Sequence, residues 1–307
     1  KEGSTKIVVS VKFQQKKKIK SKKLICSVVV EGKKEDSVQT NPPSWSKDDG
    51  VPHNTTEENE FQKILLRTNS NNEIGYEWEN GLLKSLMVQI KTDGSAQEGT
   101  EKNESLTGGI SGSLDMTVFP ELRELYCGVN QITSLNVKNN AKLEKLECPG
   151  NRLTELDISQ NTELKILYCG TNPIKSLDVA NCPNLLQLWC MDNELTELDV
   201  SHNTKLQNFW CYNNSLQVLD VSQNLEVNDL RCDGNQIKSL DVSGHAMLRV
   251  LDCSDNQLEK LKLGQNAKLE YLTCDHNQLQ VLDVSDCEKL VSIKYDEDKV
   301  VLNGWKN

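Results

Sequence analysis

Eight cysteines recur at one constant interval, and this spacing constrains the fold of the chain more than any other feature. They lie 21 residues apart and are Cys127, Cys148, Cys169, Cys190, Cys211, Cys232, Cys253 and Cys274. An asparagine follows each of them three residues later. A fixed period of this length is typical of a solenoid, in which one short unit stacks on its own copies. The sequence therefore predicts a repeating coil rather than a domain held together by disulfides.

The repeat unit, seen in Leu143 to Glu163, has the form L-x-x-L-x-C-x-x-N-x-L-x-x-L-D-V-S-x-N-x-x. Apolar and variable residues alternate in Leu125-Tyr126-Cys127, which predicts a short strand with leucine and cysteine facing inward. The strands of successive turns would pair in a parallel sheet, about 4.8 Å apart. The asparagine amide can donate and accept hydrogen bonds, so we expect it to satisfy backbone groups inside the coil.

Two rows of side chains have a structural and a functional interpretation. We interpret the cysteines as small apolar core residues at positions where leucine would overpack. Metal or redox chemistry is the alternative, but it favours close pairs such as C-x-x-C, which do not occur here. The aspartates of the L-D-V-S segments are expected to accept hydrogen bonds from backbone amides at a turn. A calcium ladder is their alternative, although Asn136 and Lys262 interrupt the row.

The period divides the chain into parts. We expect residues 122–293 to form a solenoid of eight to nine turns. A cap strand is expected at 110–121 and a C-terminal cap at 294–307, which contains Tyr295 and Trp305. Residues 1–93 have no such period and predict a small β-rich, sandwich-like domain, with a long polar loop near 31–60. Its expected strands are Ile7–Phe13, Leu24–Val30, Phe61–Leu66 and Leu86–Ile90. A polar linker is expected at 94–109.

Composition argues against several classes of protein. A net charge of −10 disfavours nucleic acid as a partner, because phosphate binding needs clustered lysine and arginine. No apolar run is long enough to span a membrane. The four histidines lie in no nucleophile or metal-ligand motif, and no phosphate-binding loop occurs, so we expect neither an enzyme nor a cofactor. The chain starts at Lys1 without a leader, so an export signal would have been removed or never have existed.

Exposed strand positions are the places where function should appear. Tyr168, Trp189 and Trp210 precede ladder cysteines in consecutive turns, so their rings should lie side by side on the concave sheet. Contiguous apolar groups in contact with water usually mark a binding surface. The candidate contact residues are Tyr126, Tyr168, Trp189, Met191, Trp210, Tyr212 and Arg231. The rings could instead stabilise the sheet through cross-strand contact, or be covered by the N-terminal domain.

The same face becomes acidic beyond the rings. The acidic residues are Asp229, Asp233, Asp252, Asp255 and Asp275, which surround Arg231. Aromatic side chains dominate interface hot spots, and charge sets orientation and encounter rate. The face therefore favours a protein partner with exposed hydrophobic and basic groups, although the rings would also suit a sugar.

The repeat resembles the short leucine-rich repeats of bacterial cell-surface proteins. It is most similar to those of gut Bacteroidetes and more distantly similar to internalin adhesins. The resemblance implies a right-handed solenoid with a concave parallel sheet, an exported location and recognition of host or microbial macromolecules. The sequence departs from internalins in its cysteine, where they commonly have leucine, in a slightly shorter repeat and in showing no helical cap.

The leading hypothesis is a non-enzymatic secreted or cell-surface binding protein that recognises a host or microbial protein, with lipid attachment through a removed leader as one form of anchoring. One alternative is a carbohydrate-binding module that uses the same rings. A second alternative is a structural spacer that presents the N-terminal domain.

Overall fold

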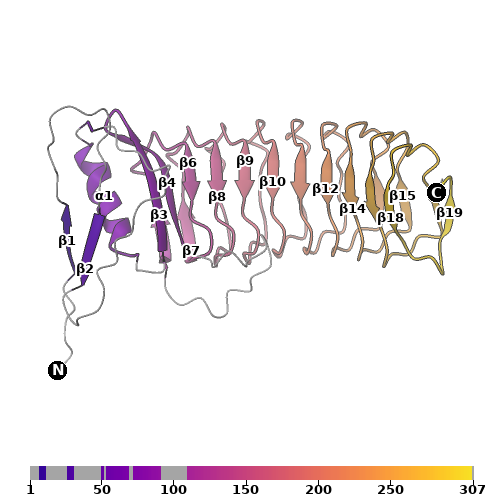
Figure 1. The fold of residues 1–307 in the computed structure, drawn as a ribbon, viewed down its shortest axis with the longest axis horizontal. Helices are drawn as coiled ribbons and strands as arrows, with labels where there is room; N and C mark the ends of the chain where they lie inside the picture. Colours follow the sequence, from indigo (N-terminus) through magenta and orange to yellow (C-terminus); the bar gives the residue numbers. More distant parts are fainter. Residues whose placement is uncertain are drawn as a thin grey trace, which may run out of the picture.

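A computed structural model of the chain describes residues 7–11, 26–30, 50–51, 53–68, 72–90 and 109–305. It is a β-solenoid of about nine turns, in which short parallel strands follow one another along the length of the molecule (Figure 1). The predicted mainly β solenoid with a parallel sheet is therefore confirmed. Within the described residues the one helix, α1, has 11 residues, and no helix is both long and apolar enough to cross a membrane.

An 11-stranded sheet forms one side of the solenoid, in the order β18-β16-β14-β12-β11-β10-β9-β8-β6-β4-β3. Its strands from the repeats are β6 (Glu124–Tyr126), β8 (Lys145–Glu147), β9 (Ile166–Tyr168), β10 (Gln187–Trp189), β11 (Asn208–Trp210), β12 (Asp229–Arg231), β14 (Val250–Asp252), β16 (Tyr271–Thr273) and β18 (Ser292–Lys294). Each pairs in parallel with the strand one turn away and in equal register, so Trp189 lies between Tyr168 and Trp210.

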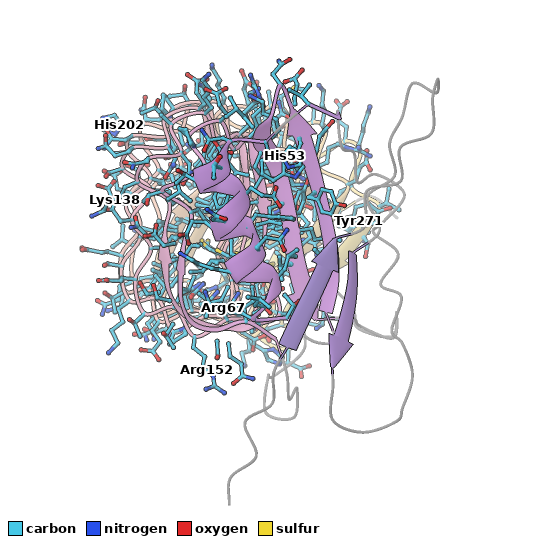
Figure 2. The ribbon with its side chains drawn as sticks, turned by 90° about the vertical axis from the view of Figure 1, so that its left-hand side faces the viewer. His53, Arg67, Lys138, Arg152, His202 and Tyr271 are labelled. Carbon is cyan, nitrogen blue, oxygen red and sulfur yellow. The ribbon has the colours of Figure 1, made fainter. Side chains whose placement is uncertain are left out.

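Shorter pairings occur elsewhere in the fold. The strand pairs are β5 (Ser111–Asp115) with β7 (Gln131–Asn136), β13 (Ser239–Asp241) with β15 (Lys260–Lys262), and β17 (Val281–Asp283) with β19 (Val301–Asn303). In addition, β1 (Ile7–Val11) and β2 (Cys26–Val30) form an antiparallel pair. In Figure 2, Lys138 and His202 lie on the side of the solenoid opposite Tyr271, which belongs to the large sheet. The turn side and the sheet side of the coil are thus separate surfaces.

The ladder cysteines fill the core. Each has at most 1% of its surface exposed, and the leucines that alternate with them on the strands are equally buried. The ten cysteines of the solenoid are all free thiols. Within the described residues no three His, Cys, Asp or Glu side chains are grouped so that they could hold a metal ion. The structure confirms the interpretation of the cysteines as apolar packing residues.

The asparagines behind the cysteines join consecutive turns. Asn172 Nδ2 donates to the carbonyl oxygens of Cys148, Cys169 and Gly170, each at 3.1 Å. Its Oδ1 accepts the backbone N–H of Leu153 at 3.1 Å. One buried side chain therefore satisfies four backbone groups in two turns. The same contacts recur in the neighbouring repeats, which confirms the predicted role.

The aspartates of the L-D-V-S segments cap turns. Asp157 Oδ1 accepts the backbone N–H of Ser159 at 3.1 Å, and the equivalent contact recurs at Asp178, Asp199, Asp220, Asp241 and Asp283. Asn136 makes a longer contact of the same kind, at 3.4 Å. Hydrogen bonds from Ser159 hold the pKa of Asp157 below its usual value. The structure confirms the capping interpretation. The neutral amide of Asn136 makes the same kind of contact, so the row does not depend on negative charge.

The described N-terminal region differs from the predicted sandwich. The predicted strand at Phe61–Leu66 is wrong, because these residues belong mostly to α1 (Thr55–Leu65). Asn54 caps this helix by accepting the N–H groups of Thr56 and Glu57. Phe61, Ile64 and Leu65 follow helical spacing and are buried. The sequence Asn54-x-x-Glu57 before this apolar pattern was the signal of a helix start.

The helix and a hairpin close the N-terminal end of the solenoid. The hairpin consists of β3 (Asn72–Glu79) and β4 (Leu82–Ile90), and β4 pairs in parallel with β6, so it extends the large sheet. Viewed along the solenoid, α1 lies across the end of the stack (Figure 2). Its apolar residues belong to the same core as the repeats. At the other end, Val300 is buried, and Tyr295 and Trp305 pack against the core. Most of the expected linker lies outside the described residues.

A residue in the left-handed region precedes each ladder asparagine. Most turns place a non-glycine residue there, including Val129 at φ 51° and Thr171 at φ 55°. Such backbone costs an L-residue about 1–2 kcal/mol, and a β-branched residue is an outlier there. Asn213 occupies the equivalent position two turns after Thr171.

We expect Thr171→Asn to increase the free energy of unfolding by about 0.5–1 kcal/mol, because asparagine tolerates this conformation. Urea unfolding would measure the change. Asn213→Thr is the reverse substitution and should decrease stability by a similar amount. If both variants change stability in the same direction, backbone strain is not the cause.

Candidate functional site

Three aromatic rings form a continuous stack on the large sheet. The ring centroids of Tyr168 and Trp189 are 3.9 Å apart with an interplanar angle of 8°, and those of Trp189 and Trp210 are 4.1 Å apart at 3°. All three side chains are half-buried. Equal register on neighbouring parallel strands produces this geometry, since each ring stands directly beside the next. We call Tyr168, Trp189 and Trp210 the aromatic ridge.

The C-terminal end of the ridge is covered by a cation. The guanidinium carbon of Arg231 lies 4.3 Å from the centroid of Trp210. Asp229 holds this guanidinium in place by accepting from Nε at 3.1 Å and from an Nη atom at 3.3 Å. The outer face of Trp210 is therefore occupied by a cation–π contact.

Tyr126 does not belong to the ridge. The turn between Tyr126 and Tyr168 carries Glu147 at the equivalent position. Lys145 Nζ lies 4.7 Å from the Tyr126 ring centroid and also 2.7 Å from Glu147. The Tyr126 hydroxyl donates to Glu124 at 2.8 Å, and burial together with this carboxylate raises the pKa of Tyr126. Tyr126 is thus held in a separate polar cluster.

Met191 contributes little to the exposed surface. We expected its side chain to project outward, but only 4% of it is exposed. Gly170, in the preceding turn, leaves the space that it fills, since a Cβ at Gly170 would lie 2.6 Å from Met191 Sδ. The prediction that Met191 projects outward is therefore wrong, because its side chain packs into the space beside Gly170. Tyr212, one turn further on, is half-buried, and burial raises its pKa.

The polar atoms of the ridge are buried or hydrogen-bonded within the chain. The Nε1 atoms of Trp189 and Trp210 are buried and have no hydrogen-bond partner. The Tyr168 hydroxyl donates to Gln187 Oε1 on the same sheet. What the two tryptophans present to solvent is therefore a hydrocarbon edge.

Sequence reasoning missed one residue beside the ridge. Asp192 directly follows Met191 and has a left-handed backbone, with φ 52°. Its Oδ1 accepts from Asn213 at 2.9 Å, but its Oδ2 is buried without a partner. Burial raises the pKa of this carboxyl group. Its position in the left-handed row, where glycine or asparagine is common, was the available signal.

The geometry defines the class of protein, a leucine-rich repeat solenoid with an apolar ridge on its sheet. Among solved structures the chain is similar to the functional domain of InlJ from Listeria monocytogenes, a domain that includes a cysteine ladder. The two share 35% sequence identity with a TM-score of 0.57, over 62% of this chain and 41% of that one. The chain thus spans less than half the length of this relative.

Two further structures share the fold. A leucine-rich repeat protein of Leptospira interrogans is 25% identical, with a TM-score of 0.51, over 61% of this chain and 56% of its own. The internalin inlF of Listeria monocytogenes is 20% identical, with a TM-score of 0.51, over 63% of this chain and 65% of its own. No protein-family model and no curated protein matches the sequence. The internalin-type likeness predicted from the repeat is supported at the level of the fold.

Proposed function

We propose that this chain is a non-enzymatic binding module that recognises a protein through the aromatic ridge. The observation that carries the proposal is the hydrocarbon edge of Trp189 and Trp210, half-exposed at the middle of a rigid sheet. Large, immobilised aromatic side chains with an apolar surface are the usual anchors of protein interfaces. Tyr168, Tyr212 and Arg231 would extend the contact, whereas Tyr126 and Met191 would contribute less.

The ring stacking argues against the carbohydrate alternative. A sugar that packs on an aromatic side chain needs a free ring face. Both faces of Trp189 are covered by its neighbours, and Trp210 is covered by Trp189 and Arg231. The buried indole N–H groups are also unable to donate to a sugar hydroxyl. An apolar ridge of ring edges suits a hydrophobic side chain of a protein instead.

The alternatives concerning the N-terminal region have less support. The described helix and hairpin continue the end of the solenoid and do not lie over the ridge (Figure 1). A pure spacer has no need of exposed rings on its sheet. We further propose a secreted or cell-surface location and a host or microbial partner, as the resemblance to Bacteroidetes-type surface repeats implies; a lipid anchor would fit this location.

The experiment is a peptide-display selection with the intact chain as bait, followed by affinity measurement on variants. Changing Trp189 and Trp210 together to alanine should weaken the selected binders at least about a hundredfold, the effect of losing two hot-spot residues. Val218→Ser is the control, because this 74% exposed apolar side chain lies outside the large sheet.

Unchanged binding by the double variant, with its circular dichroism spectrum intact, would reject the ridge as the site. An oligosaccharide panel gives the competing result. If sugars shift the tryptophan fluorescence of the native chain but not that of the double variant, the carbohydrate alternative replaces the proposal.

A further inference from the structure

Carboxylates without a fixed cation lie beside the aromatic ridge. Asp233 follows Arg231 on the same turn, and Asp252 and Asp255 belong to the next turn. Asp252 Oδ1 accepts only from the N–H and hydroxyl groups of Ser254, at 3.1 and 2.7 Å. Within the described residues no lysine or arginine forms an ion pair with any of these three aspartates. We call Asp233, Asp252 and Asp255 the acidic triad.

Several other charges on this side of the solenoid are paired. Arg249 binds Glu270 at 2.9 Å, and Lys145 binds Glu147 at 2.7 Å. Fixed ion pairs of this kind remove the attraction for an external charge. The acidic triad differs from these pairs in having no lysine or arginine partner among the described residues, a feature that it shares with Asp192, and it starts one turn beyond the end of the ridge.

A buried carboxylate oxygen adjoins the triad. The Asp275 side chain is only 7% exposed, and its Oδ1 is buried without a hydrogen-bond partner. Its Oδ2 accepts from Lys294 at 2.9 Å. His276 connects it to the triad, since its Nδ1 lies 3.4 Å from Asp275 and 3.1 Å from Asp255. A buried acceptor without a partner is costly, and this oxygen adds a further negative group next to the triad.

The negative charges of Asp252 and Asp255 act on Asp233. Burial, together with the nearby charges of Asp252 and Asp255, raises the pKa of Asp233 to about 7, while a backbone hydrogen bond and Arg231 oppose the shift. Tyr212 on the preceding turn and the thiols of Cys211, Cys232 and Cys253 are other titratable groups near it. Carboxylates concentrated in this way are commonly found at functional sites.

We propose that the acidic triad binds lysine or arginine side chains of the protein partner, next to an apolar residue of that partner on the ridge. This proposal rests on the proposed function and specifies its partner as a basic segment. The carboxylates are spread over successive turns, about 4.8 Å apart, which suits a chain with several cations better than a single ion.

The spacing sets the pattern of the partner. Asp252 lies two turns beyond Trp210, which corresponds to about 10 Å along the solenoid. An extended peptide advances about 3.3 Å per residue. A basic residue should therefore follow the apolar anchor by about three residues in a segment that runs along the solenoid axis.

The contact should depend on pH. Asp233 is increasingly protonated as the pH falls through 7, and a neutral carboxyl group attracts a cation less. Affinity for a basic segment should therefore increase severalfold from pH 6 to pH 8. His276 contacts Asp255 and Asp275, so it needs its own control.

The test uses three labelled synthetic peptides with the same leucine anchor and, three residues later, three lysines, three glutamines or three glutamates. Fluorescence anisotropy with the full chain should show the lysine peptide binding at least tenfold tighter than the glutamine peptide, and the glutamate peptide weakest. The variant Asp233→Asn, Asp252→Asn, Asp255→Asn should remove this preference. The control changes Asp157, Asp199 and Asp220 to asparagine, which alters net charge equally, and it should keep the preference.

Measurements at different pH values test the contribution of Asp233 alone. Binding of the lysine peptide should become independent of pH in Asp233→Asn and remain dependent on pH in His276→Gln. Equal binding of the three peptides, no binding of any, or an unchanged preference in the triple variant would overturn the proposal. Displacement of the lysine peptide by millimolar calcium at constant ionic strength would also overturn it, in favour of a cation site.

Failure of the acidic-triad proposal can be distinguished from failure of the proposed function. If Trp189→Ala with Trp210→Ala weakens the display-selected binders but the triple variant does not alter charge preference, the ridge remains the site and the triad does not take part. If the double tryptophan variant leaves those binders unaffected, the ridge itself is rejected.

Discussion

Asn172→Ala should lower the free energy of unfolding by about 3–5 kcal/mol, among the largest effects available to a single substitution in this chain. The change removes the Nδ2 donor from three carbonyl oxygens and the Oδ1 acceptor from the buried N–H of Leu153. Buried polar groups left without a partner cost about 1–3 kcal/mol each. Because these hydrogen bonds join two turns, their loss should weaken the coupling between the parts of the solenoid on either side of Asn172.

Urea unfolding followed by circular dichroism would measure the change, and an altered slope would show that cooperativity between turns is lost. Asn139→Ala is the matched control, since this exposed asparagine donates a hydrogen bond of 3.3 Å to the Thr117 carbonyl at the surface. It should change stability by less than about 0.5 kcal/mol. A cost below about 1 kcal/mol for Asn172→Ala would mean that the asparagine row does not hold the turns together.

The ladder thiols should react with alkylating reagents about a thousandfold more slowly in the native protein than in denaturant, a factor set by the free energy of opening a core of ordinary stability. The thiolate is the reactive form. Burial raises the pKa of Cys169 to about 12 and that of Cys190 and Cys211 well above the ordinary value. Neither reagent nor charge can reach these sulfur atoms until the coil opens.

Labelling at pH 8 with peptide mapping by mass spectrometry would test this expectation residue by residue. Cys287, near the C-terminal end and 6% exposed, should react before the central thiols and serves as an internal reference. Rapid labelling of Cys190 or Cys211 under native conditions would contradict the packing role and indicate that the middle of the solenoid opens readily.

The periodic sequence determined most of the fold, because a repeated unit places each residue type in the same environment in each turn. Cysteine and leucine on alternate strand positions could only be buried together, and the asparagine three residues later had to meet backbone groups of the turn. The identity and order of the rings on the sheet followed from the same register. This is why Tyr168, Trp189 and Trp210 were predicted to be neighbours.

Where the period stops, sequence reasoning was less successful. Phe61–Leu66 has the apolar content of a strand, but the cap at Asn54 and the spacing of Phe61, Ile64 and Leu65 produce a helix that closes the stack. A single segment cannot show which end of a solenoid it will cover. The apolar face of this helix packs against the apolar end of the first turn, and that surface exists only in the folded solenoid.

The period and the residue types determined that this chain is a stacked coil with aromatic side chains on its sheet. Only the tertiary structure decided what that surface presents. Face-to-face stacking leaves the ring edges exposed, and Gly170 makes room that buries Met191. Three carboxylates that form no ion pair with a described lysine or arginine lie near Arg231. These outcomes depend on contacts between side chains one turn apart, about 4.8 Å along the axis. At this distance the volume and charge of one side chain determine how the neighbouring side chain can pack.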